Sequence, residues 1–297
     1  MSDSRGYPGP LDVESGLPYS KGLLARALMA TGVSAVRAYE LALRVEADLT
    51  VSGARTVDLD RLEELARDVL GEGEGERAVQ RLRSYEELRR LDLPLILLVG
   101  GATGTGKSTV ATEVAYRLGI TRVTSTDFIR QTMRAFFSEE FMPSIHHSSF
   151  EAVPSAEESV DPVLDGFFEQ TRNVLVGVRA ALERALQEGW SIVLEGVHLV
   201  PGMLPPIEGA LVVHCVLEIE EPQAHAAHFW VRDATSEGLR PVQRYLDALD
   251  DIRVVQTAIV ERAQRAGVPV VENSNIERTV ATVMELVLAS VERLERV

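Results

Sequence analysis

The spacing of apolar residues divides the chain into a helical part and a part in which strands and helices alternate. From residue 17 to residue 92, apolar residues recur every three or four positions, as on the buried face of an amphipathic helix. The predicted helices are 22–29, 35–49, 58–70 and 77–91. The Gly–Glu run 71–76 is typical of a turn or short linker. The pattern therefore predicts a small, mainly helical domain over residues 17–92.

After Pro94 the apolar residues form short runs separated by amphipathic segments. Residues 95–99 are apolar without a break, as in a strand that is buried on both faces. The predicted strands are 95–99, 122–125, 191–194, 210–219 and 268–271. The predicted helices are 107–118, 127–137, 163–188, 221–233, 241–266 and 276–297, with a long loop at 138–161. This alternation predicts an α/β fold, a doubly wound parallel five-stranded sheet, in a domain over residues 93–297.

Composition and charge narrow the class of protein. The 297 residues carry a formal net charge of −15, which argues against a nucleic-acid surface because phosphate backbones are bound by clustered Lys and Arg. The longest apolar runs fall well short of the roughly 20 residues that cross a bilayer, and the single Cys cannot form an internal disulfide. Residues 1–16 predict a disordered tail. We expect a cytoplasmic protein without nucleic-acid or membrane partners, either monomeric or homo-oligomeric.

A glycine-rich motif between the first predicted strand and the next helix indicates nucleotide binding. It fits the phosphate-binding loop (P-loop, or Walker A) pattern G-x-x-x-x-G-K-[ST], whose glycines let backbone N–H groups approach phosphate oxygens. Lys107, one of only two lysines, is expected to reach the β- and γ-phosphates, and the Ser108 hydroxyl to bind Mg²⁺. The predicted nucleotide-binding residues here are Gly101, Ala102, Thr103, Gly104, Thr105, Gly106, Lys107, Ser108 and Thr109. The motif predicts a P-loop kinase-like core that uses ATP as co-substrate and Mg²⁺ as cofactor.

Other residues separate the classes of P-loop protein. A base-reading N-K-x-D motif, expected of a GTPase, does not occur in the sequence. The apolar strand 191–194 is followed by Glu195, which we predict as a second magnesium ligand beside Ser108. The alternative for Glu195 is an ordinary strand end next to a turn. The sequence therefore favours a small-molecule kinase over a GTPase.

The end of the second predicted strand carries candidate acceptor residues. Asp127 is expected at the edge of the sheet that faces the ligand crevice, where its carboxylate can take the proton of an acceptor hydroxyl. Arg130 and Arg134 follow on one helix face and are predicted to grip an anionic acceptor. The alternatives are a helix N-cap for Asp127 and a solvated helix face for the two arginines.

Two further groups complete the predicted site. Arg232 and Arg240 are predicted to supply catalytic positive charge from a lid, with Arg244 beside the acceptor. Ordinary surface arginines are the alternative in this Arg-rich chain. The predicted acceptor contacts in the polar loop are His147, Ser148 and Ser149. His225 and His228 have metal-pair spacing, but no third ligand is evident, so we expect them to be packing histidines.

These motifs together resemble the 2-phosphoglycerate kinase family. The segments that carry the resemblance are 99–109, 126–130, 143–152, 225–232, 244–253 and 267–273. The resemblance implies transfer of a phosphoryl group from ATP to the 3-hydroxyl of 2-phosphoglycerate, which gives 2,3-bisphosphoglycerate. It also implies that Asn273 belongs to the nucleotide site. Residues 17–26 resemble the ATP-cone-like domain that precedes the kinase domain in that family.

Two other functions remain open at this stage. One is a P-loop kinase that phosphorylates another phosphorylated polyol or sugar acid. The other is a non-catalytic protein that senses ATP, although such a sensor needs neither Asp127 nor the lid arginines. The several arginines around Asp127 favour an acceptor that carries anionic groups.

Overall fold

The computed structural model describes residues 20–152, 154, 159–235 and 242–294, and these form two compact units. The first unit contains the described residues up to Asp92, with Tyr116–Gly119 and the described residues from Val280 on. The second unit contains Leu93–Ala115 and the described residues of Ile120–Thr279. The predicted tail at 1–16 lies outside the described residues. The domain ranges and the ATP-cone-like character of the first unit stay predictions.

The first unit is built from helices, as the apolar spacing predicts. These are α1 (Lys21–Ala30), α2 (Ala35–Ser52), α3 (Leu59–Leu70) and α4 (Glu72–Arg90). The Ser20 and Asp58 side chains cap α1 and α3 by accepting hydrogen bonds from the N–H groups of Leu23 and Arg61. The apolar faces meet in a core whose largest fully buried side chains are Leu24, Leu28, Leu41, Leu62, Leu65 and Leu82.

The Gly–Glu run at 71–76 is not a linker, and that prediction is wrong. Only Gly71 interrupts the helices, because α4 already begins at Glu72. Gly75 allows this continuation: a Cβ there would lie 2.7 Å from the backbone of Ala66 in α3, so the glycine lets the two helices approach closely. Glu72 and Glu74 also lie in the first turn of α4, where the helix dipole favours negative charge.

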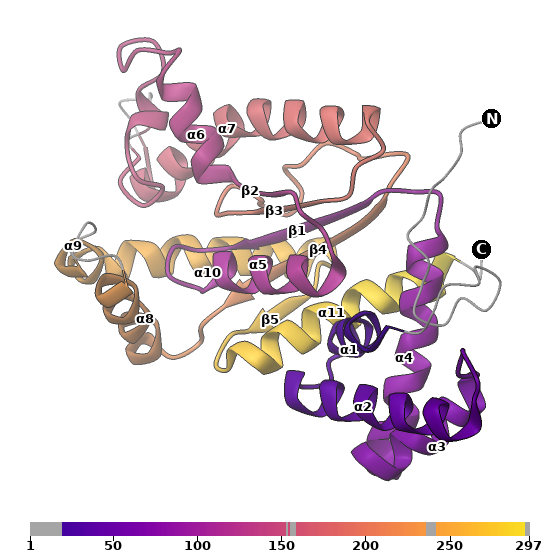
Figure 1. The fold of residues 1–297 in the computed structure, drawn as a ribbon. Helices are drawn as coiled ribbons and strands as arrows, with labels where there is room; N and C mark the ends of the chain where they lie inside the picture. Colours follow the sequence, from indigo (N-terminus) through magenta and orange to yellow (C-terminus); the bar gives the residue numbers. More distant parts are fainter. Residues whose placement is uncertain (1–19, 153, 155–158, 236–241, 295–297) are drawn as a thin grey trace. The chain divides into compact units, whose positions relative to one another are not determined.

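The second unit contains the predicted five-stranded parallel sheet (Figure 1). Its strands are β1 (Leu95–Gly101), β2 (Val123–Ser125), β3 (Ile192–Glu195), β4 (Leu211–Glu218) and β5 (Val270–Glu272). Their order is β2-β3-β1-β4-β5, and all neighbouring strands are parallel. Every residue of β1 is buried, as its unbroken apolar sequence predicts. The α/β fold class with a parallel five-stranded sheet is therefore confirmed.

Helices cover both faces of this sheet. The helices after β1 are α5 (Lys107–Leu118), α6 (Thr126–Arg134), α7 (Pro162–Gln187), α8 (Pro222–Thr235), α9 (Val242–Asp247), α10 (Leu249–Ala266) and α11 (Ile276–Leu294), with a short 3₁₀ helix η1 (Pro143–His146). The end of α5 and the part of α11 from Val280 on belong to the first unit. Side chains of α7 and α10 share an apolar cluster with Val216 of β4. The predicted helix 241–266 is broken at Ala248, and the predicted long loop contains η1.

Cys215 lies in the middle of this unit. It is in β4, opposite Val99 of β1, and is fully buried. Burial raises the pKa of its thiol to about 12, so the thiolate does not form at neutral pH. Within the described ranges, the helices lack the combination of length and apolar character that a membrane span requires.

Candidate active site

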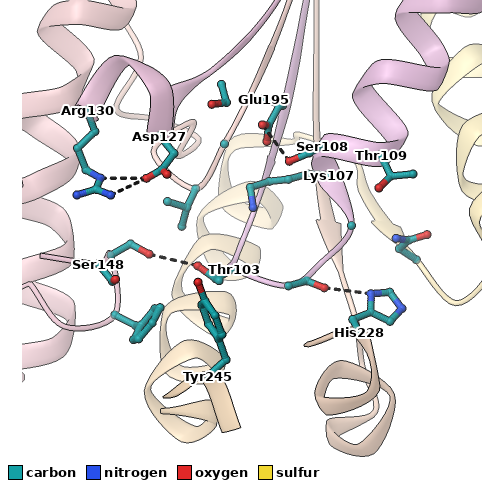
Figure 2. A pocket seen from close by; sticks show the side chains of 18 of the residues that line it. Thr103, Lys107, Ser108, Thr109, Asp127, Arg130, Ser148, Glu195, His228 and Tyr245 are labelled. Carbon is teal, nitrogen blue, oxygen red and sulfur yellow. Dashed lines mark hydrogen bonds and ion pairs between the residues drawn. The ribbon is translucent and has the colours of Figure 1, made fainter. Parts of the chain in front are cut away.

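A cavity of about 900 Å³ opens in the second unit at the carboxyl ends of the strands (Figure 2). It is lined by the P-loop after β1, the start of α6, residues 148–150, the end of β3, and residues that follow β5. The chain returns to the two sides of β1 as β3 and β4, so the P-loop lies where the strand order reverses. Parallel α/β sheets bind ligands at this position.

The P-loop conformation depends on its glycines. Gly104 and Gly106 have φ angles of 87° and 80°, which residues with a Cβ rarely adopt. A Cβ on Gly106 would also lie 2.3 Å from the amide nitrogen of Asn273. That amide donates a 2.9 Å hydrogen bond to the carbonyl of Thr105, and its oxygen accepts one of 2.8 Å from Thr279. Asn273 therefore supports the loop from the end of β5.

Lys107 and Ser108 carry the chemical groups of the loop. The Lys107 amine donates a 3.1 Å hydrogen bond to the carbonyl of Ala102, and its side chain reaches into the cavity (Figure 2). Burial lowers the pKa of Lys107, while the carboxylates of Glu195 and Asp127 act in the opposite direction. The Ser108 hydroxyl donates a 3.0 Å hydrogen bond to Glu195 Oε1 at the end of β3. These two oxygens suit a hard divalent cation, which binds through oxygen ligands.

Asp127 stands across the cavity from the P-loop, near the start of α6 (Figure 2). The cap of this helix is Ser125, whose hydroxyl accepts from the N–H of Phe128, so Asp127 is not needed as the cap. The Asp127 side chain is 60% exposed, and its Oδ1 accepts hydrogen bonds of 3.0 and 2.8 Å from Nε and Nη2 of Arg130. This pairing fixes the carboxylate while leaving it open to the cavity.

The segment 143–150, called here the acceptor loop, forms the next wall. The buried Arg130 donates from Nη1 to the carbonyls of Ile145 and His147, at 2.7 and 2.8 Å. Ser149 lies 3.4 Å from the Thr103 hydroxyl, measured between the side-chain oxygens. Arg130 thereby links Asp127 to the acceptor loop, and Ser149 links that loop to the P-loop.

An ion pair from α9 closes the same side of the cavity. Arg244 pairs with Glu151 through both carboxylate oxygens and donates a 3.1 Å hydrogen bond to the Ser148 hydroxyl. This hydrogen bonding lowers the pKa of Glu151. Tyr245, the next residue, also lines the cavity and stacks on Phe229 of α8 at 5.0 Å between ring centroids.

Comparison with known proteins decides the family. The 2-phosphoglycerate kinase of Thermococcus kodakarensis is 38% identical over 280 residues, which are 94% of this chain and 95% of that protein. The 2-phosphoglycerate kinases of Methanopyrus kandleri and Pyrococcus horikoshii are 34% and 36% identical over 94% and 91% of this chain, and over 86% and 89% of their own lengths. The chain belongs to the 2-phosphoglycerate kinase family. No protein-family model matches the chain.

The family assignment makes this chain a phosphotransferase that acts on an alcohol group. The structure brings most of the predicted site residues of this kinase to one cavity. Those that line it are Thr103, Gly104, Gly106, Lys107, Ser108, Thr109, Asp127, Arg130, Ser148, Ser149, Glu195, Arg244 and Asn273. Gly101, Ala102 and Thr105 do not line it but shape the loop, since the Ala102 carbonyl accepts from both Lys107 and Thr105. Their roles in binding and catalysis stay predictions.

Other predicted residues are placed differently. Arg134 is exposed, donates to the side chain of Gln131 and does not line the cavity. His147 contributes its backbone carbonyl to Arg130, while its ring lies 3.8 Å from Glu139. The Arg232 side chain and the whole of Arg240 lie outside the described residues, so their predicted lid role has no structural test.

Sequence reasoning missed what the α8 histidines contact. His225 Nε2 lies 2.8 Å from the carbonyl of Thr103, and His228 Nδ1 lies 3.0 Å from the carbonyl of Gly104. Carbonyls only accept, so both ring nitrogens carry hydrogen and donate to the P-loop. The spacing of three residues puts both rings on one helix face, which was the available signal. The loop carbonyls, more than 120 positions earlier in the chain, could not be inferred from it.

Proposed function

We propose that this kinase transfers the γ-phosphoryl group of ATP to the 3-hydroxyl of 2-phosphoglycerate, giving 2,3-bisphosphoglycerate and ADP. One observation carries the proposal: Asp127 and the P-loop lysine line the same cavity. The names of the relatives support 2-phosphoglycerate as the acceptor.

The nucleotide side of the proposal rests on the P-loop. The polyphosphate of ATP would lie against the N–H groups of the loop and the N-terminus of α5, which carries partial positive charge. Lys107 already reaches into the cavity, and it would exchange the Ala102 carbonyl for phosphate oxygens. Phosphate charge would raise its lowered pKa, so bound nucleotide and the charged amine would favour each other.

A divalent cation, proposed to be Mg²⁺, would be held by the Ser108 hydroxyl and, directly or through water, by Glu195. Their 3.0 Å hydrogen bond shows that the two oxygens already converge on one place. When bound, the cation would neutralise charge on the β- and γ-phosphates.

The acceptor side of the proposal rests on Asp127. Its carboxylate is fixed by Arg130 and open to the cavity, so it would accept the proton of the 3-hydroxyl as that oxygen attacks the γ-phosphorus. The new oxygen–phosphorus bond forms while the bond from the γ-phosphorus to the β,γ-bridging oxygen breaks, and ADP leaves. The proton passes from Asp127 to solvent. Ser148, Ser149 and Arg244 line the same wall and would contact the anionic groups of the acceptor.

The test is an ADP-formation assay with product identification. Purified protein with Mg²⁺ and ATP should consume ATP with 2-phosphoglycerate, and ³¹P NMR should show two phosphate monoesters on one glycerate. 3-Phosphoglycerate, glycerate and sugar-acid phosphates are the comparison acceptors. Lys107→Ala is the control for a contaminating kinase. Faster turnover of another phosphorylated polyol or sugar acid would overturn the acceptor, and ATP binding without any acceptor-dependent turnover would overturn the reaction.

A further inference from the structure

A fully buried histidine behind the active-site cavity has no part in the reaction as proposed. His198 follows β3 and lies between two buried polar side chains. Its Nδ1 is 2.8 Å from the hydroxyl of Thr126, the first residue of α6. Its Nε2 is 2.9 Å from Oε1 of Gln170 in α7. Thr126, Gln170 and His198 are each 0% exposed, so every partner here is a protein group.

The donor and the acceptor of each of these hydrogen bonds can be assigned by starting from Gln170. The Gln170 amide nitrogen donates to the carbonyls of Ser144 and His147, which can only accept. The Gln170 amide therefore cannot be flipped, and its oxygen faces His198. The His198 Nε2 must carry hydrogen to donate to that oxygen. In the neutral ring Nδ1 is then an acceptor, and the Thr126 hydroxyl donates to it.

The surroundings of the His198 ring favour its neutral form. Burial lowers the pKa of His198 to about 3, and Arg130 adds to this effect, while Asp127 opposes it and Lys107 reinforces it. The imidazole is thus a fixed donor–acceptor bridge over the whole physiological pH range.

This bridge ends on the acceptor loop. Gln170 holds the carbonyls of Ser144 and His147, and Asn173, one turn further along α7, donates a 2.9 Å hydrogen bond to the Ser144 hydroxyl. The His147 carbonyl is also held by Arg130, the partner of Asp127. The loop is therefore fixed twice to α6, once through Arg130 and once through the buried histidine.

We propose that His198 is a positioning residue: as the Nε2–H tautomer it connects Thr126 to Gln170 and so holds the acceptor loop at a fixed distance from Asp127. The inference rests on the proposed function, because it takes Asp127 and the loop as the acceptor side. His198 does not line the cavity and acts only through these neighbours.

Two substitutions separate the two halves of the bridge. His198→Asn keeps an acceptor near the Nδ1 position but cannot reach Gln170. His198→Gln places an amide N–H near the Nε2 position and keeps the contact with Gln170. We expect His198→Asn to lower kcat/KM for the acceptor about 10- to 100-fold with KM for ATP unchanged, since a shift of about 1 Å near reacting groups costs on this order. His198→Gln should recover much of that loss.

His214→Asn is the matched control. His214 is a partly buried histidine of β4 whose 3.2 Å hydrogen bond goes to the Leu199 carbonyl and not to α6 or the acceptor loop. His214→Asn should lower thermal stability without changing acceptor KM.

Equal losses in both His198 variants, or a parallel rise in KM for ATP, would show that His198 merely fills space and would overturn the inference. If His198→Asn does not fold, Thr126→Val replaces the hydroxyl by a methyl group, which cannot donate to Nδ1, and should give the same kinetic split.

Two measurements do not depend on the acceptor. In ¹⁵N-histidine-labelled protein, the His198 ring, assigned by the signal lost on its replacement, should show a protonated Nε2 and an unprotonated Nδ1 that do not titrate between pH 6 and 8. This signal should be absent in His198→Asn. Amide hydrogen exchange in residues 143–150 should be about five- to tenfold faster in His198→Asn, while residues 103–109 stay unchanged. The opposite tautomer, or unchanged exchange, overturns the inference even if 2-phosphoglycerate is the acceptor. Inactive wild-type protein with the expected exchange pattern overturns only the proposed function.

Discussion

Replacing Arg130 by lysine is the sharpest test of how this active site is built. The side chain is 8% exposed and makes four hydrogen bonds, two to Asp127 and two to the carbonyls of Ile145 and His147. Four of its five N–H groups are thereby accounted for, which leaves one for a ligand. An ammonium group is a point donor on a flexible stem and cannot span both Asp127 and the two carbonyls.

The expected loss of folding stability in Arg130→Lys follows from these contacts. If the lysine ammonium stays with Asp127, the hydrogen bonds from a charged group to the Ile145 and His147 carbonyls are lost, each worth about 1.5–3 kcal/mol. The contact with Asp127 adds little to stability, because that carboxylate is 60% exposed and screened by water. A change of about 2 kcal/mol in a unit of this size lowers Tm by roughly 4–8 °C. Without the Arg130 contacts, Asp127 and the acceptor loop are held less firmly. This should raise the acceptor KM while KM for ATP stays constant.

Calorimetry and steady-state kinetics with each substrate varied in turn measure both effects. Arg134→Lys is the matched control, because Arg134 is on the same helix but exposed and outside the cavity. It should change stability by less than about 0.5 kcal/mol and leave both KM values unchanged. Wild-type Tm and acceptor KM in Arg130→Lys would refute the reasoning. A raised acceptor KM in Arg134→Lys would instead support the sequence-based hypothesis that both arginines grip the acceptor.

Four further outcomes are expected. Lys107→Ala should abolish turnover with the fold intact, because the lysine supplies charge to the transferring phosphoryl group; circular dichroism and an ADP assay check this, and full activity would contradict it. Asp127→Asn should lower kcat about 10²–10⁴-fold with little change in ATP affinity, and a matching loss of ATP affinity would make Asp127 a nucleotide-site residue instead. Glu195→Gln should raise the Mg²⁺ concentration needed for half-maximal turnover, and an unchanged Mg²⁺ titration would remove Glu195 from the metal site. Burial lowers the pKa of His214 to about 4, below its unfolded value of about 6.5, so its contribution is complete above pH 6.5 and is lost as the pH falls toward 4. Urea unfolding at pH 7 and pH 5 should therefore show about 2 kcal/mol less acid destabilisation in His214→Asn than in the wild type, and equal losses would contradict this.

The sequence predicted the architecture because the decisive signals were local. The unbroken apolar run of β1, the P-loop after it and the alternating helices depend on residues close together in the chain. The helical start of α4 was missed because its Gly–Glu composition is typical of a turn. Its helix is stabilised by packing against α3, which no local pattern records.

The candidate site was predictable as a set of residues but not as a set of contacts. Arg130 and Arg134 are equivalent by helical spacing, yet the folding of the acceptor loop over α6 buries one and leaves the other in solvent. The same holds for the histidines of α8, whose partners lie in the P-loop. Such long-range pairing is fixed by the tertiary fold, so residue type and spacing alone could not give it.

The buried position of Cys215 makes this kinase convenient for probe studies. Its only thiol is enclosed between β-strands and remains protonated at neutral pH, so maleimide reagents should leave the native protein unmodified. Any cysteine placed on the surface is then a unique attachment point, without removal of a native residue. Arg134→Cys and Asp247→Cys would put paired fluorophores on α6 and α9, on exposed positions. Energy transfer between them would report whether these helices move as nucleotide and acceptor enter the cavity.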